Sequence, residues 1–389
     1  MTAQGDQGQV LDDLVVSKPT ALEATRAPQA GTGLCLSGGG YRAMLFHAGA
    51  LRRLSEAALL ARVARVSSVS GGSIAAAALA VAWPQLKDSS FAPTTFEELV
   101  EAPLRRLAER TIDVPSVLLG LITPFFSASD YIARSYRPLL GEATLQDLPD
   151  DPPRFVFTAT NLQSTVLWRF SKPYAWDYLV GKVERPELPL TRVVAASSAS
   201  PPFLSPVRLK LRDKDFAPDA PGELGEAPYT TRPVLSDGGV YDNLGLEPVW
   251  KRYETLLVSD GGGKTLPSPD VAGDWARHSF RVLMTIDNQV RSLRKRALLA
   301  SYEDGRRRGA YWGIRTDVAN YARDDLLPCP LDKTRLLAAV PTRLKRLAPR
   351  TQEALINWGY AVCDAAIRTH LEPSLSAPGD FPYPAVGVG

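Results

Sequence analysis

Cysteine and histidine are scarce in this sequence, and both shortages argue against whole classes of site. The 389 residues include three cysteines that lie far apart: Cys35, Cys329 and Cys363. They form neither a disulfide framework nor the ligand spacing of a zinc site, which fits a reducing, cytoplasmic compartment. The three histidines are His47, His278 and His370. This number argues against a multi-histidine metal centre and leaves few bases for a Ser-His-Asp triad.

A long apolar run and a large excess of one charge are also missing. The longest apolar stretches are residues 74–83 and residues 114–126, and two prolines interrupt the second, so neither spans a bilayer. Lys and Arg exceed Asp and Glu by 45 to 42, which is too small an excess to suggest a nucleic-acid partner. Residues 1–30 lack the apolar segment of a secretory signal. We expect a cytoplasmic protein that is soluble or peripheral at a membrane.

Composition changes along the chain divide it into four predicted segments. Residues 1–30 are polar and predict a flexible N-terminal segment, and residues 31–264 carry the motifs of one folded domain. Residues 265–371 contain helical patterns and predict a helical C-terminal extension packed on the core. The last segment, 372–389, holds four prolines and predicts a disordered tail.

The start of the folded domain predicts a parallel βαβ arrangement. An apolar run at 33–36 ends in glycines, and residues 41–60 then carry apolar side chains at helical spacing. A β-branched run at 63–69 is followed by a glycine turn and the alanine-rich stretch 74–83. Strand, glycine turn and helix, repeated twice, is typical of a parallel sheet with helices on its faces. We expect a three-layer α/β fold with a mainly parallel central sheet.

Ser70 is the strongest candidate for a nucleophile. It follows the β-branched run directly and precedes a helix, which is the position of the serine in a nucleophile elbow. Ser68 stands where the usual G-x-S-x-G pattern has its first glycine, and Gly72 provides the second. Ser73 is the alternative, but it would lie inside the helix, where its hydroxyl would cap the backbone.

Three successive glycines, 38 to 40, form the second motif, with Arg42 just beyond them. Glycines at the start of a helix let backbone N–H groups converge on an anion, which can be a phosphate or the oxyanion of acyl transfer. Ala43 occupies the third glycine position of a dinucleotide fingerprint, and a Walker lysine is absent. A tight structural turn is the remaining alternative.

Carboxylates are the candidates for the base that a serine nucleophile needs. Asp237 follows the short apolar run 234–236 and is followed by two glycines. Asp260 stands in the same local pattern and is the rival, and Asp242 is expected to stabilise a turn. His47 lies in an apolar helix and is expected to be a packed, hydrogen-bonded residue.

Together, the G-G-G-x-R loop, the serine elbow about 30 residues later and the distant D-G-G resemble the patatin-like phospholipase family over residues 33–263. The small-residue block 196–201 resembles the one that the family places between elbow and aspartate. The resemblance implies an α/β acyl hydrolase with a Ser-Asp dyad. It implies Ser70 as nucleophile and Asp237 as base, since Asp242 and Asn243 match the D-N pair that follows the family's D-G-G. It implies an oxyanion hole of Gly38, Gly39, Gly40 and Arg42, to which we add the amide of Gly71.

The function expected from this resemblance is hydrolysis of acyl esters of phospholipids or related lipids through an acyl-enzyme. The nucleophile, base and oxyanion donors all come from the chain, so we expect no metal and no organic cofactor. The alternatives are an esterase or thioesterase for soluble acyl compounds and a non-catalytic lipid- or phosphate-binding protein.

Two further features remain open. Basic residues gather at 291–296, 306–308 and 343–346, and they indicate either solvated helix faces or attraction to anionic lipid headgroups. The apolar stretch 114–126 is expected to pack as core, with a lid over the acyl site as the alternative.

Overall fold

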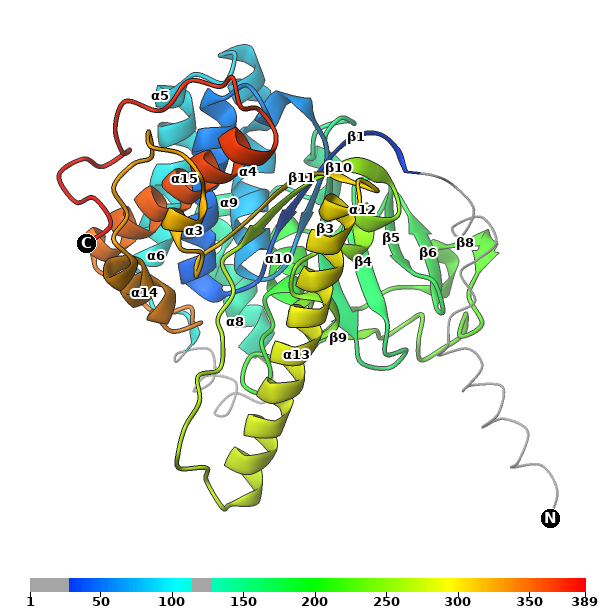
Figure 1. Cartoon of the computed structure of the whole chain (residues 1–389). Helices are drawn as coiled ribbons and strands as arrows, with labels where there is room; N and C mark the ends of the chain where they lie inside the picture. Colours follow the sequence, from blue (N-terminus) through cyan, green and yellow to red (C-terminus); the bar gives the residue numbers. More distant parts are fainter. Residues whose placement is uncertain (1–27, 114–127) are drawn as a thin grey trace.

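The structure is a computed structural model, and it describes residues 28–113 and 128–389 (Figure 1). The predicted flexible segment 1–30 lies almost entirely outside the described residues, and the predicted core or lid stretch 114–126 lies wholly outside them.

A row of five parallel strands forms the centre of the molecule. Their order is β11 (Arg308–Gly313), β10 (Tyr253–Asp260), β1 (Gln29–Leu36), β2 (Val63–Ser68) and β3 (Arg154–Asn161). Apolar side chains of these strands are buried on both faces of the sheet, as parallel strands between two helical layers require. The α/β fold with a parallel centre, predicted from the sequence, is confirmed.

Antiparallel strands extend this centre on the side of β3. The extension runs through β4 (Leu167–Ser171), β5 (Tyr174–Asp177), β6 (Gly181–Glu184) and β8 (Phe216–Pro221). Strand β9 (Val234–Asp237) also pairs antiparallel with β3, and β7 (Val207–Arg208) pairs with β9. Because β9 is antiparallel to β3, its last residue, Asp237, lies opposite Ala159.

Helices cover both faces of the sheet (Figure 1). The larger core contains α3 (Gly40–Glu56), α4 (Gly71–Asp88), α10 (Leu190–Ser197) and α15 (Pro349–His370). The same side also carries α5 (Pro93–Phe96), a π-helical turn (Glu97–Glu101), α6 (Ala102–Ala108), α8 (Ala128–Ser135), α9 (Arg137–Leu140) and α14 (Leu331–Ala339). A smaller core holds side chains from α12 (Glu247–Trp250) and from α13 (Trp275–Glu303) against β1 and β10, and the one-turn α11 (Gly239–Asp242) follows β9.

Residues beyond 264 supply part of this core. Strand β11 is an outer strand of the parallel row, and α15 packs closely against α3. A Cβ at Gly49 would overlap the Ile356 carbonyl oxygen, and one at Gly359 would overlap the Phe46 carbonyl oxygen. The backbones of the two helices therefore touch, which only glycine allows at these two positions.

The tail 372–389 differs from the disorder that its prolines predicted. The Asn357 amide of α15 donates to the carbonyls of Tyr383, at 2.8 Å, and Gly387, at 2.7 Å, and its oxygen accepts from the Tyr383 N–H at 2.9 Å. Phe381 and Val388 are buried. Prolines exclude a helix here, but one buried amide and two apolar side chains are enough to hold the segment on α15.

Within the described residues, every helix is too short or too polar to cross a bilayer.

Candidate active site

Ser70 lies at the sharp turn between β2 and α4. Its backbone has φ 52° and ψ −119°, a region that residues with a Cβ rarely adopt. Helix α4 begins at the next residue, so the positive end of the helix dipole points toward the serine. The residue is 8% exposed. This is the strained strand-to-helix turn of a nucleophile elbow, with the hydroxyl at the edge of the sheet.

The Asp237 carboxylate meets the Ser70 hydroxyl. Burial raises the pKa of Asp237 from 3.8 to about 6, while hydrogen bonds from the Gly239 N–H, at 2.8 Å, and from the Ser70 hydroxyl oppose this rise. The charge of Asp287, in α13, adds to the rise. A carboxylate with this pKa is ionised at neutral pH and is a stronger base than an exposed aspartate, which suits proton removal from a serine.

Ser197, at the end of α10, connects the two halves of this pair. Its hydroxyl oxygen accepts the Ser70 N–H at 3.1 Å, and its carbonyl accepts the Gly238 N–H at 3.3 Å. The Asp237 N–H donates to the Ala199 carbonyl at 3.0 Å. The small-residue block 196–201 therefore lies between elbow and aspartate and fixes both backbones.

The glycine loop packs directly on the elbow. A Cβ at Gly38 would lie 3.2 Å from the Ser70 Cβ, and one at Gly71 would overlap the Gly40 carbonyl. The Gly38 N–H donates to the Asn243 carbonyl at 3.1 Å, so it cannot also bind an oxyanion. The N–H groups of Gly39, Gly40 and Gly71 make no hydrogen bond within the described residues, and these three are the donors that the geometry leaves for an oxyanion.

The Arg42 guanidinium is engaged elsewhere. Nε donates to the Gly261 carbonyl at 3.1 Å, Nη2 donates to the Thr342 hydroxyl at 2.8 Å, and Nη1 donates to the Val340 carbonyl. These acceptors belong to the loop after β10 and to the segment before α15. The resemblance implied Arg42 in the oxyanion hole, whereas its contacts give it the role of holding the glycine loop in place.

Ser73, the alternative nucleophile, is fully buried. Its hydroxyl lies 3.0 Å from the Ser68 hydroxyl and 2.8 Å from the Ser197 hydroxyl. It therefore completes a chain of three serine hydroxyls behind the elbow, out of reach of a substrate.

Asp260, the rival base, faces different partners. It pairs with Arg291 at 3.2 Å and accepts the Tyr311 hydroxyl at 2.8 Å and the Gly262 N–H at 2.9 Å. Burial acts to raise the pKa of Asp260, but the Arg291 charge and these hydrogen bonds outweigh it and lower that pKa. A carboxylate stabilised in this way is a weak base.

Two further candidates are structural. Asp242 accepts the N–H groups of Leu244, at 3.2 Å, and Glu247, at 2.8 Å, and so stabilises the turn after α11. His47 Nε2 bonds to the Ser37 carbonyl at 2.9 Å, so it carries the proton, and Nδ1 accepts from Ser259 at 2.8 Å. Burial lowers the pKa of His47 to about 4, which keeps the imidazole neutral at pH 7.

Sequence reasoning missed the part that the C-terminal region plays at the glycine loop. The Tyr41 N–H donates to the Arg343 carbonyl at 3.0 Å, and a Cβ at Gly40 would lie 2.6 Å from the same oxygen. Arg343 itself pairs with Asp113 at 2.6 Å. Of residues 340–343, the sequence analysis noted only Arg343, as part of a basic cluster, and no local pattern links this segment to a motif that far away in the chain.

Across residues 28–113 and 128–389, no group of three or more His, Cys, Asp or Glu side chains is arranged to hold a metal ion.

A serine at a strained strand-to-helix turn, beside a glycine loop on a mixed α/β sheet, has the arrangement of a nucleophile elbow. Residues 34–250 match the family model of the patatin-like phospholipases. The match covers more than half of the chain, and the chain belongs to this family.

Comparison with curated protein sequences finds no match. Among solved structures, human GIVD cytosolic phospholipase A2, bound to methyl gamma-linolenyl fluorophosphonate and terbium chloride, is 14% identical with a TM-score of 0.47. The match covers 92% of this chain and 62% of the human one. VipD from Legionella pneumophila is 14% identical at a TM-score of 0.37, and the match covers 88% of this chain and 68% of VipD. The type III effector ExoU is 16% identical at 0.34, with 89% and 54% covered. These low scores support no conclusion about function.

Proposed function

We propose that this chain hydrolyses acyl esters of phospholipids or related lipids, with Ser70 as nucleophile and Asp237 as its base. The observation that carries the proposal is the strained elbow that holds the Ser70 hydroxyl beside the buried Asp237 carboxylate, where it acts on the pKa of Asp237. Membership of the patatin-like phospholipase family supports a lipid as the acyl donor. The three thiols are unpaired and buried, which supports a place in a reducing compartment such as the cytoplasm.

The proposed mechanism gives each of these groups a defined role. Ser70 Oγ attacks the acyl carbonyl carbon while its proton moves to Asp237. The negative charge on the former carbonyl oxygen is stabilised by the N–H groups of Gly39, Gly40 and Gly71 and by the N-terminal end of α4. Collapse of this intermediate expels the alcohol, which takes the proton from Asp237. Water then attacks the acyl-enzyme, with Asp237 again accepting the proton, and Ser70 is regenerated.

Labelling by a fluorophosphonate, read by intact mass, tests the dyad. We expect one adduct on the wild type, no adduct on Ser70→Ala, and labelling slowed at least 100-fold on Asp237→Asn, which keeps the shape but removes the base. Ser73→Ala is the matched control, because it removes a neighbouring buried hydroxyl and should keep its label. Labelling of Ser70→Ala at the wild-type rate contradicts the proposal, provided that circular dichroism shows each variant folded.

The substrate class needs a second assay. Release of fatty acid from phospholipid vesicles is compared with hydrolysis of a short-chain thioester by the same preparation. We expect a higher kcat/KM with phospholipid. A preference for the soluble thioester would make the chain a soluble-acyl hydrolase, and a folded wild type that neither labels nor hydrolyses would make it a binding protein.

A further inference from the structure

The N-terminal part of α13 extends beyond the rest of the molecule (Figure 1). Its large apolar side chains there are exposed, with Trp275 at 83% and Leu283 at 63% of their full accessible surface. The exposed apolar residues that share one side of the helix are Trp275, Val282, Leu283, Ile286, Val290 and Leu293. We call these six residues the α13 stripe.

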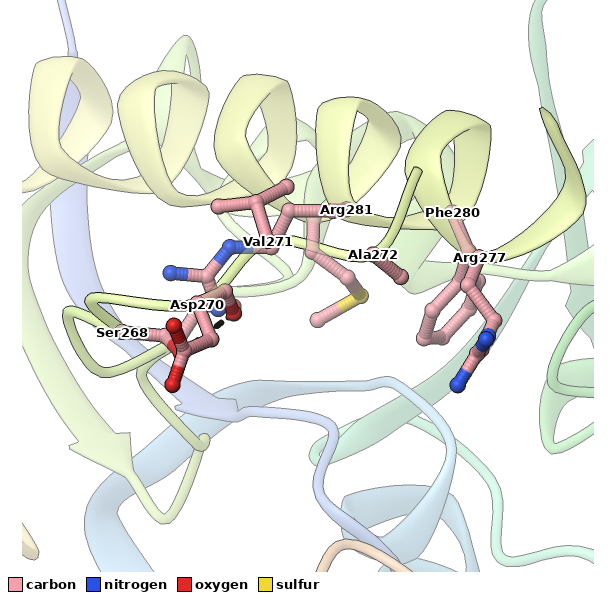
Figure 2. Close-up of a pocket in the computed structure, with 9 residues that line it drawn as sticks. Ser268, Asp270, Val271, Ala272, Arg277, Phe280 and Arg281 are labelled. Atoms are coloured by element: carbon pink, nitrogen blue, oxygen red, sulfur yellow. Dashed lines mark hydrogen bonds between the residues drawn. The ribbon is translucent and has the colours of Figure 1, made fainter. Parts of the chain in front are cut away.

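The stripe is one face of an amphipathic helix. At 3.6 residues per turn its six members fall within an arc of about 100°. The side chains of Arg277, Arg281 and Met284 point the opposite way, toward the loop 264–274. Together with residues of that loop they line a cavity of about 320 Å³. Figure 2 shows Arg277 and Arg281 on the helix side of this cavity. The loop therefore lies along part of the other face of α13 and leaves the stripe exposed.

The same helix passes the proposed active site. The charge of Asp287 acts on Asp237, and Arg291 pairs with Asp260 at 3.2 Å. Further on, Leu298 is buried in the smaller core against β10. The C-terminal end of α13 is therefore anchored beside the site. The stripe extends away from this anchor toward the N-terminal end of the helix.

The charge of α13 is basic. The helix carries six Lys or Arg residues and two acidic ones, Asp287 and Glu303. A helix with an apolar stripe and an excess of Lys and Arg has the chemistry of segments that lie in the headgroup region of a bilayer. Arg277, Arg291 and Arg294 pair with Asp274, Asp260 and Glu247, so the attraction of the helix to anionic lipid comes from its other three basic residues.

We propose that the α13 stripe inserts into the surface of an anionic phospholipid bilayer and holds the site around Ser70 next to the lipid. This inference rests on the proposed function. An enzyme that takes lipid from a bilayer must bring its nucleophile to the interface, and the stripe would do so. An apolar stripe of this size on a helix otherwise exposed to water is the mark of a membrane or protein contact, and the basic excess favours the membrane.

Vesicle binding tests the inference in a Ser70→Ala background, so that hydrolysis does not change the vesicles and the result does not depend on catalysis. The probe is a sedimentable vesicle of phosphatidylcholine with about one third phosphatidylglycerol. We expect Leu283→Glu with Ile286→Glu to weaken binding at least tenfold. The matched control is Leu336→Glu, which charges a leucine that is 67% exposed on α14 and should bind as the parent does.

Trp275 offers a second measurement that involves no charge change. Lipids brominated in the acyl chain should quench part of the tryptophan fluorescence of the parent, and this part should be lost in Trp275→Phe.

Absence of binding by the parent, equal binding by the Leu283/Ile286 variant, or an equal loss in Leu336→Glu would overturn the proposal. So would a parent that is a dimer in solution, dissociated by the stripe variant and indifferent to vesicles. A parent that binds vesicles through the stripe while the wild type fails to label would leave this proposal standing and remove the catalytic one.

Discussion

At the residue scale, the arrangement around Ser70 depends on burying one carboxylate next to one hydroxyl. Asp237 accepts a hydrogen bond from the Gly239 N–H and lies against the Ser70 hydroxyl, and within the described residues it forms no salt bridge. Asp260, in the same local sequence pattern, has an arginine partner. The two aspartates therefore have pKa values shifted in opposite directions, and only the raised one lies at the serine.

The pH dependence of hydrolysis follows from this difference. Asp237 must be ionised to accept the Ser70 proton, and its pKa is about 6. We expect kcat/KM for a soluble ester to rise about tenfold per pH unit below pH 6 and to level off above pH 7. A profile that stays flat from pH 4.5 to pH 8 would contradict the assignment of Asp237 as the base.

The same shift predicts that Asp237→Asn stabilises the fold at alkaline pH. The folded-state pKa, about 6, lies above the unfolded value of 3.8, so the carboxyl group contributes stability below pH 4 that is lost as pH rises through 6. Two pKa units correspond to about 3 kcal/mol. We expect the variant to exceed the wild type in unfolding free energy by about 1–3 kcal/mol at pH 8, measured in urea. Equal stabilities of the two proteins at pH 8 would show that the carboxylate is not destabilised by burial.

At the scale of elements, the crossing of α3 and α15 fixes the position of the helix that begins at the glycine loop. Helix α3 begins at Gly40, so its N-terminus is the end of the glycine loop. Gly49 and Gly359 let the two backbones touch, and Arg53 pairs with Asp364 across the same crossing at 2.8 Å. Any change that separates these helices therefore moves the proposed oxyanion donors.

A methyl group at the crossing tests this coupling. Gly49→Ala would place a Cβ on the Ile356 carbonyl, which the backbone of α15 cannot avoid without shifting. We expect a loss of about 1–3 kcal/mol in unfolding free energy, together with slower fluorophosphonate labelling. Gly273→Ala is the control, because a Cβ there meets nothing within 4 Å. An unchanged melting temperature in Gly49→Ala would show that the crossing is looser than described.

At the scale of the whole molecule, the chain after residue 264 is part of the same core as the family-matched region. It provides β11 and α15, and residues 340–343 hold the glycine loop through Arg42 and Tyr41. Residues 34–250 alone would leave the face of α3 that packs on α15 uncovered.

Two experiments test whether the fold needs the residues after 264 themselves or only an unbroken chain. Removal of residues 265–389 should abolish cooperative unfolding, because α3 and β10 would lose their partners. A protease site placed in the exposed loop 264–274 of the full chain should, once cleaved, leave one particle with one melting transition. Separation of the two fragments on size exclusion would mean that the C-terminal part is an independent domain.

The sequence by itself determined the local parts of this protein. Glycine patterns and β-branched runs predicted the strands and helices around residues 33–83, because backbone conformation and side-chain periodicity are decided by near neighbours. They also singled out Ser70, the glycine loop and a short set of aspartates.

Tertiary structure decided how these parts meet. Only the antiparallel pairing of β9 with β3 places Asp237, rather than Asp260, at Ser70. Only the tertiary packing shows that the Gly38 N–H is bonded to the Asn243 carbonyl. Only the position of residues 340–343 beside the glycine loop shows what the Arg42 guanidinium binds. The physical reason is the same in each case. These contacts join residues far apart in the chain, and their partners are chosen by the packing of the whole core rather than by any local pattern.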